Sequence, residues 1–261
     1  LDYSDEHNPV IQDYVDYYVG QYPSAESLTA KVKDYIEEHK LKKAYCCLVL
    51  DDADYQLLSV EPPKVPQEEM AEAVKWKIKD LIQYPISEAV VDIFSHPEVS
   101  GVHRDIVDVV VSPKEIIDKK AAFIEAIGLN LVAVDIPEFS YRNYIESTTH
   151  AESNLALVLL KPFHGKLVVI NKGSVCFSRS FVVNYNGGLF DDIPENDIVL
   201  ELQRSLDYYE RQMKQVMPAV VVFAGENLID DKVTEVTKES FNQKVLVETV
   251  SGFNFDEEDS L

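Results

Sequence analysis

The sequence LALVLLKPFHGKLVVINKGSVCFSRSF, residues 155–181, decides the fold. Its apolar runs predict three β-strands joined by tight turns at His164-Gly165 and Lys172-Gly173. The first connection, KPFHG (161–165), has one glycine and no acidic residue, and its proline has no backbone N–H. A phosphate site needs several N–H groups directed at the phosphate, and a metal-bound nucleotide also needs a carboxylate. This turn is therefore poorly equipped to bind a nucleotide.

Apolar strands alternate with amphipathic helices on both sides of this meander, which predicts an α/β fold with two sheets. Further strands are expected at 44–50, 55–60, 89–94, 106–111, 131–134, 219–224 and 245–250. Helices are expected at 25–39, 68–83, 113–127, 137–147, 197–215 and 227–237.

Three of these elements carry specific expectations. The strand at 44–50 is apolar throughout, which indicates burial on both faces. The helix at 68–83 has one apolar stripe that includes Ile78 and Leu81. Ser112 is expected to cap the helix that follows it, and Gly128 to end that helix.

The composition restricts the class of protein. The chain has 261 residues, 46% of them hydrophobic, and a net charge of −22, which disfavours nucleic acid and anionic membrane surfaces as direct partners. Its three cysteines form no C-x-x-C motif and fit a reducing compartment. No apolar run has the roughly 20 residues that a membrane span needs, and no signal peptide is visible. We therefore expect a cytoplasmic protein.

Three stretches, taken in order, resemble the PilM family of pilus biogenesis proteins. Residues 66–92 (PQEEMAEAVKWKIKDLIQYPISEAVVD) combine an acidic helix, a central tryptophan, a Tyr-Pro step and a strand. Residues 109–135 (VVVSPKEIIDKKAAFIEAIGLNLVAVD) read as strand, helix, Gly-Leu, strand and Asp. Residues 201–209 (ELQRSLDYY) are similar to the helix before the family's last core strand. Lys77 and the end of the first stretch look closest to MshI, which serves the mannose-sensitive haemagglutinin (MSHA) pilus.

The resemblance implies an actin-like, ribonuclease H-like fold with two lobes and a small FtsA-type α+β subdomain. Residues 1–152 would form the first lobe, with the subdomain at 53–112, and residues 153–261 the second lobe. It also implies a scaffold peripheral to the inner membrane, which grips the cytoplasmic tail of a PilN-like membrane protein. A secretion ATPase is a further expected partner. A cell-division scaffold of the FtsA kind is an alternative, but the acidic residues 253–261 lack the cationic face of a membrane helix.

The resemblance also locates a degenerate nucleotide cleft. The second phosphate turn of such proteins would fall at Phe163, His164 and Gly165, and the adenosine motif at Gly225 and Glu226. A carboxylate close to a polyphosphate is unfavourable without a metal ion. We therefore expect no cofactor, no metal site and no catalytic residue. The cytoplasmic domain of GspL is a comparable actin-like fold reported without nucleotide. The alternative is an ATPase that binds ATP and Mg²⁺ through unusual turns.

Partner binding is expected at Trp76, Lys77, Tyr84 and Phe94, in a groove between the small subdomain and the first lobe. Trp76 lies opposite the apolar stripe of its helix, so it is either an interface anchor or part of a second packed face. The lysines at 75, 77 and 79 could meet acidic groups of a peptide. Strand addition along an exposed sheet edge is the expected mode of binding.

Overall fold

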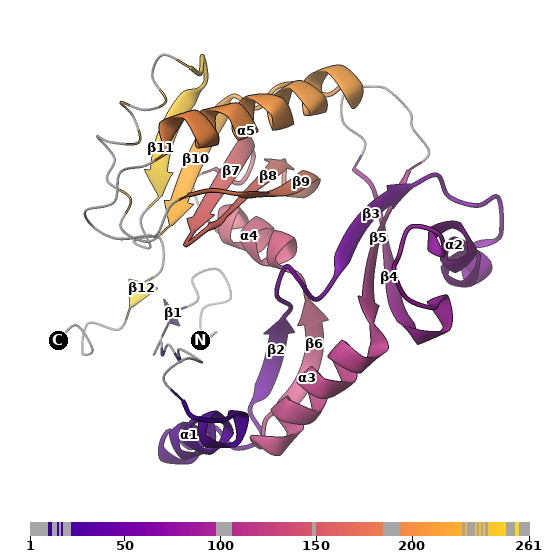
Figure 1. The fold of residues 1–261 in the computed structure, drawn as a ribbon, viewed down its shortest axis with the longest axis vertical. Coiled ribbons are helices and arrows are strands. Elements are labelled where there is room, and N and C mark those ends of the chain that lie inside the picture. Colours follow the sequence, from indigo (N-terminus) through magenta and orange to yellow (C-terminus); the bar gives the residue numbers. More distant parts are fainter. Residues whose placement is uncertain are drawn as a thin grey trace. The chain divides into compact units, whose positions relative to one another are not determined.

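The computed structural model describes residues 10–11, 15, 17, 22–97, 106–147, 150–184, 194–225, 228, 233, 235, 237, 240–248 and 254–255 (Figure 1). The chain forms two compact units. The first unit comprises Tyr14–His96 and Arg104–Ser140, and the second comprises Leu1–Asp13, Pro97–His103 and Tyr141–Leu261. The predicted lobe boundary after residue 152 remains a prediction.

The first unit contains a parallel pair of strands, β2 (Tyr45–Val49) and β6 (Asn130–Asp135). Helices α1 (Ala25–Glu38) and α3 (Lys114–Ala126) pack on one face of this pair through a cluster of buried isoleucines, Ile36, Ile124 and Ile127. Ser24 and Ser27 form a capping box at the start of α1. Gly128, with φ of +88°, directly follows the last residues of α3, as predicted.

The same unit carries a small antiparallel sheet in the order β3 (Gln56–Val60), β5 (Val107–Pro113), β4 (Ala89–Ser95). Helix α2 (Met70–Ile78) covers one face of this sheet, where its Val74 and Ile78 pack on Val109 and Val111. Short 3₁₀ helices at Gln67–Glu69 and Ile86–Glu88 precede α2 and β4. The alternate residues of β5 face away from α2.

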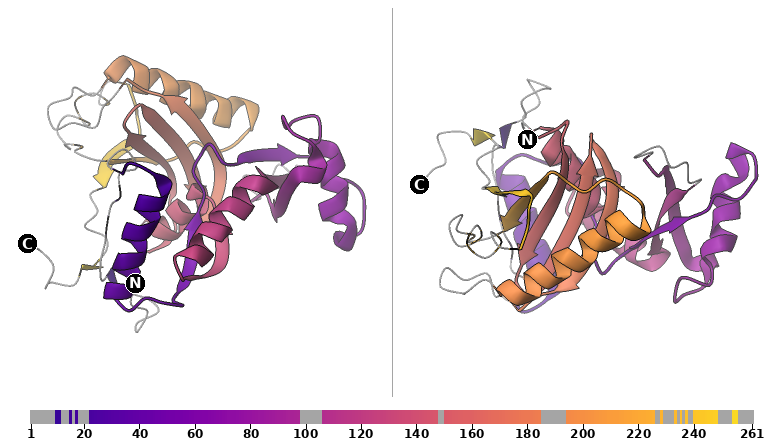
Figure 2. Two further views of the ribbon diagram at one scale, coloured as in Figure 1. Left: turned by 60° about the horizontal axis from the view of Figure 1, so that its bottom comes forward. Right: turned by 90° about the horizontal axis from the view of Figure 1, so that it is seen from above.

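The second unit is built on a five-stranded sheet in the order β11-β10-β7-β8-β9. The antiparallel meander β7 (Asn154–Lys161), β8 (His164–Asn171) and β9 (Ser174–Val182) is confirmed, and β10 (Val220–Gly225) and β11 (Lys244–Glu248) extend it in parallel. Helix α5 (Glu195–Asp207) and a π-helical turn (Tyr208–Gln212) cover one face, as Figure 2 shows. The unit also includes most of α4 (Pro137–Glu146) and the two-residue pair β1 (Val10–Ile11) and β12 (Asn254–Phe255).

Four local predictions were wrong. The first meander turn lies at Pro162-Phe163, not at His164-Gly165, which begin β8. Ser112 is the second-last residue of β5 and donates a hydrogen bond to the Asp54 carbonyl (2.7 Å) instead of capping α3. The strand at 44–50 is exposed on one face, and Leu81 is 53% exposed because α2 ends at Ile78. Most of the helix predicted at 227–237 lies outside the described residues.

Candidate functional site

A groove in the first unit lies on the face of the small sheet opposite α2. Its cavity volume is about 260 Å³, and its walls come from β4, β5, the end of β6, α3 and the start of α4. Most of the lining is aliphatic or aromatic, and three lining residues are polar; the set is Leu50, Val90, Asp92, Phe94, Val110, Ser112, Ile117, Val134, Asp135, Ile136 and Phe139. Such a surface suits apolar side chains with a few polar groups to orient them.

Strand alternation positions the groove residues. Val90, Asp92 and Phe94 are alternate residues of β4, so they share the face that lines the groove. Phe94 packs edge-to-face on Phe139 of α4, with ring centroids 4.8 Å apart and planes at 73°. This contact ties the edge strand of the small sheet to the wall of the groove.

A second cavity, of about 230 Å³, lies along the same strand. Its lining includes Met70 and Ala71 of α2 and residues 91–95 of β4. Asp92 and Phe94 border both cavities, whereas Val91 and Ile93 border only this one. Strand β4 is at the edge of its sheet and has one hydrogen-bonded neighbour, β5, among the described residues. A segment added along this edge would therefore place alternate side chains in two different cavities.

Carboxylates give the groove a negative character. Asp92 accepts the backbone N–H of Ile93 (2.8 Å), and Asp135 accepts that of Ile136 (2.8 Å). Each of these bonds uses one oxygen, and a carboxylate has further acceptor sites for a cationic group. The groove is thus suited to a segment that combines apolar and basic side chains.

A buried carboxylate of the small sheet, Asp108, was not recognised in the sequence. Asp108 of β5 accepts hydrogen bonds from Ser59, at 2.5 Å, and His96, at 2.7 Å, and so joins β3 to the end of β4. Within the described part of the chain, no group of three or more potential ligands could hold a metal ion.

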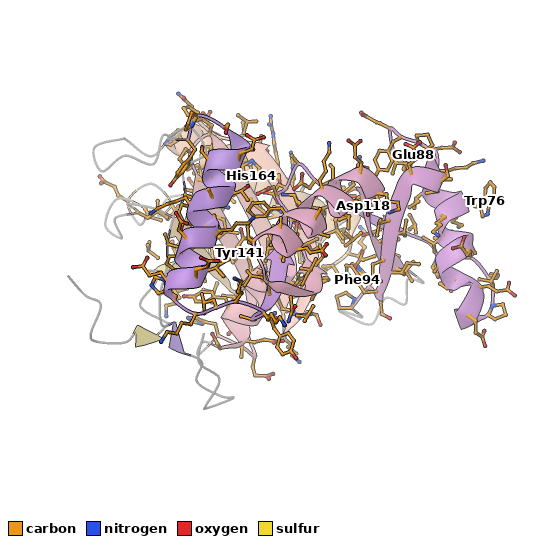
Figure 3. All side chains as sticks on the ribbon, turned by 90° about the horizontal axis from the view of Figure 1, so that it is seen from below. Trp76, Glu88, Phe94, Asp118, Tyr141 and His164 are labelled. Atoms are coloured by element: carbon orange, nitrogen blue, oxygen red, sulfur yellow. The ribbon has the colours of Figure 1, made fainter. Side chains whose placement is uncertain are left out.

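Of the four predicted partner-binding residues, the structure places only Phe94 in the groove. Trp76 is 69% exposed on the outer face of α2, with Lys79 Nζ 5.6 Å from its ring centroid (Figure 3). Lys77 is also exposed on α2, whereas Tyr84 packs against the buried cluster under that helix. The small sheet separates these three from the groove, and a role for them in partner binding remains a prediction.

The residues assigned to a degenerate nucleotide cleft gather at one end of the second unit's sheet. Leu160 of β7 pairs with Gly165 on one side and Gly225 on the other, and Phe163 and His164 adjoin this row. A Cβ atom on Gly165 would lie 2.2 Å from the Phe181 ring, and one on Gly225 would lie 2.4 Å from the Leu160 carbonyl oxygen. Close packing thus accounts for both glycines. Glu226 lies outside the described residues.

Solved structures share this fold. One, described as a PilM-PilN type IV pilus biogenesis complex, has 20% sequence identity and a TM-score of 0.67, and covers 88% of this chain and 76% of that chain. The cytoplasmic domain of EpsL, an inner membrane component of the type II secretion system of Vibrio cholerae, has 11% identity, a TM-score of 0.50 and coverages of 88% and 74%. A Bacteroides thetaiotaomicron protein of unknown function, described as having an actin-like ATPase fold, is less similar. It has 12% sequence identity and a TM-score of 0.43, and covers 87% of this chain and 78% of that chain.

The chain has an actin-like α/β fold, as the sequence predicted. No protein-family model matches the sequence, and neither does any curated protein. Across the described ranges, no helix combines the length and apolar character needed to cross a membrane.

Proposed function

We propose that this protein is a cytoplasmic scaffold of type IV pilus assembly, of the PilM/MshI kind, which binds an extended segment of an inner-membrane protein. The observation that carries the proposal is the apolar groove beside the free edge of β4, with Phe94 in its wall. The shared fold with the protein of a PilM-PilN complex supports the choice of a PilN-like partner. The proposed role in the assembly of an MSHA-like pilus rests on the resemblance of residues 66–92 to MshI.

The groove defines the chemistry of the bound segment. Apolar side chains at alternate positions would fill the two cavities beside β4, and a lysine or arginine would lie near Asp92 and Asp135. Cytoplasmic tails close to membrane spans are enriched in lysine and arginine, so such a tail meets both requirements. Through this contact the protein would be held at the inner membrane, where a secretion ATPase is a second proposed partner.

Titration of a fluorescently labelled tail peptide from the PilN-like protein tests this function. Phe94→Ala removes an aromatic wall of the groove and should weaken binding about tenfold or more, as expected of a buried aromatic anchor. Asp92→Asn should weaken binding less than Phe94→Ala does. Its effect on affinity should be larger at low salt than at high salt, because salt screens the lost charge interaction. Trp76→Ala is the matched control, because its ring is exposed across the sheet.

Equal affinities of wild type and Phe94→Ala would contradict the proposed site, provided that circular dichroism shows the variant to be folded. A large loss with Trp76→Ala alone would instead assign the partner to the outer face of α2. The two aromatic substitutions thus distinguish the two surfaces.

We also propose that the protein works without nucleotide and is not an enzyme. Support comes from Pro162 and Phe163, which occupy the turn between β7 and β8, and from Phe181, whose ring fills the space beside Gly165. Titration with a fluorescent ATP analogue and Mg²⁺ tests this proposal. We expect no saturable signal; micromolar binding would favour the alternative, an ATPase with unusual turns.

A further inference from the structure

The free edge of β4 presents the backbone groups of alternate residues. Ala89 pairs with Pro113 of β5, and proline has no backbone N–H, so this pair cannot exchange the two bonds of a hydrogen-bonded pair. The two kinds of pair alternate along an antiparallel ladder, so Val91 and Ile93 also lie in non-hydrogen-bonded pairs with β5. Their N–H and C=O groups therefore point away from β5, toward the edge at which a further strand would be added.

One of these edge donors is occupied by a side chain of β4 itself. The N–H of Ile93 donates to Asp92 Oδ1 at 2.8 Å, which agrees with its direction away from β5. Asp92 is exposed and borders both cavities beside the strand. Because its carboxylate covers an outward-directed N–H, it occupies the position that the backbone of an added strand needs. Charged side chains are one means by which proteins prevent edge strands from pairing with other chains.

A strand that pairs with this edge must displace the carboxylate. Such a strand presents a backbone carbonyl oxygen to the Ile93 N–H, and Asp92 Oδ1 already accepts that hydrogen. If the carboxylate stays, the incoming carbonyl lacks its donor, and binding is weakened. A lysine or arginine beside Asp92 removes this penalty, because its cationic group forms a charge-assisted hydrogen bond with the displaced carboxylate.

We propose that Asp92 determines the specificity of the β4 edge: its carboxylate closes the edge to neutral segments and moves from the Ile93 N–H to a lysine or arginine of the bound tail. The inference rests on the proposed function, since the occupant is the cytoplasmic tail of the PilN-like protein. Specificity then comes from a contact that opposes neutral segments as well as from attraction of basic ones. In the complex the Ile93 N–H would donate to a backbone carbonyl of the tail.

Two substitutions separate the charge of Asp92 from its hydrogen bond. Asp92→Ala removes both and leaves the Ile93 N–H open, whereas Asp92→Asn keeps an acceptor oxygen and removes only the charge. Each variant is titrated with the labelled tail peptide and with a second peptide in which glutamine replaces every lysine and arginine. Asp135→Asn is the matched control, because it removes a charge from the same groove and leaves the Asp92 contact in place.

The glutamine peptide gives the decisive comparison. Wild type should bind it at least about tenfold more weakly than the basic peptide, and Asp92→Ala should bind it at least about threefold more tightly than wild type does. Asp92→Asn and Asp135→Asn should show little of this gain. No gain with Asp92→Ala would overturn the proposal, since a merely attractive carboxylate predicts that result. An equal gain with Asp92→Asn would also overturn it, because the charge alone would then exclude neutral segments.

Amide exchange in the free protein tests the same contact without a peptide. Asp92→Ala should lower the protection factor of the Ile93 amide at least about fivefold, and Asp92→Asn should leave it close to the wild-type value. Equal protection in wild type and Asp92→Ala would overturn the proposal whether or not the tail binds. Lower protection together with equal tail affinities of wild type and Phe94→Ala would instead support the closed edge and contradict the proposed function.

Discussion

Single residues in the second unit show how close packing fixes residue identity. Leu160 pairs with Gly165 and Gly225 across three strands, and neither glycine has space for a side chain. The ring of Phe181 occupies the space beside Gly165, an arrangement in which an aromatic side chain covers a glycine in the neighbouring strand. The glycines that the sequence analysis assigned to a degenerate nucleotide cleft thus have a packing role in the sheet.

Replacement of Gly165 tests this packing role. Gly165→Ala should lower the free energy of unfolding by about 1–3 kcal/mol, because the added methyl group meets the Phe181 ring. In a Phe181→Ala background the same substitution should cost less, since the ring is gone. Urea denaturation of the wild type, the two single variants and the double variant measures the coupling, and Ser180→Ala at an exposed position is the control. Equal costs in both backgrounds would contradict a clash with the ring.

The buried hydroxyl of Tyr55 predicts a pH dependence. Burial, and then its hydrogen bond to Glu138, raises the pKa of Tyr55 far above its usual value. The unfolded chain loses this proton near pH 10 while the folded chain keeps it, so stability is complete below about pH 10 and falls above it. Burial also raises the pKa of Tyr209, so the ionisation of this residue in the unfolded chain lowers the stability further above about pH 10.

Tyr55→Phe should make the decline in unfolding free energy above pH 10 shallower by about 1.4 kcal/mol per pH unit. Urea denaturation between pH 8 and about pH 11 measures both slopes. Tyr208→Phe, at an exposed position, should leave the slope unchanged. Identical slopes in wild type and Tyr55→Phe would show that Tyr55 ionises equally in both states.

At the scale of helices and strands, the sequence predicted those elements whose apolar residues recur at regular spacing. The meander, α1, α3, α4 and the apolar stripe of α5 follow from apolar spacing, and they lie close to the predicted positions. The wrong assignments depend on competing contacts. Ser112 bonds to Asp54, 58 residues earlier in the chain, and a short Pro-Phe turn replaces the expected His-Gly turn. The partner of Ser112 is distant in the sequence, so a local pattern does not reveal it. The turn differs from the expected one by a small shift in strand register, which local residue types do not specify.

The end of α2 provides a test at this scale. Ile78 is fully buried against the small sheet, and Leu81, predicted on the same stripe, is 53% exposed. Ile78→Ala should cost about 2–5 kcal/mol of unfolding free energy. Leu81→Ala, a truncation of similar size, should cost well under about 1 kcal/mol because its side chain is mostly in water. Similar costs would mean that the helix continues past Ile78 and buries both residues.

At the scale of the whole molecule, the candidate site depends on β5, whose two faces contact different parts of the structure. Strand β5 supports α2 through Val109 and Val111 and the groove through Val110 and Ser112. The sequence predicted a groove beside the small subdomain and included Phe94 in it. It could not assign Trp76 and Phe94 to opposite sides of the sheet, because that separation depends on how α2 docks. The acidic lining from Asp92 and Asp135 likewise requires the fold, which brings β4 and β6 together.

Hydrogen–deuterium exchange with and without the tail peptide of the PilN-like protein tests the central claim most directly. Binding along the edge of β4 should slow amide exchange in Ala89–Ser95 and at the end of β6, since these segments border the groove. The outer face of α2 should exchange at the same rate in both samples. Slowed exchange confined to Met70–Ile78, or no change at all with saturating peptide, would contradict the account.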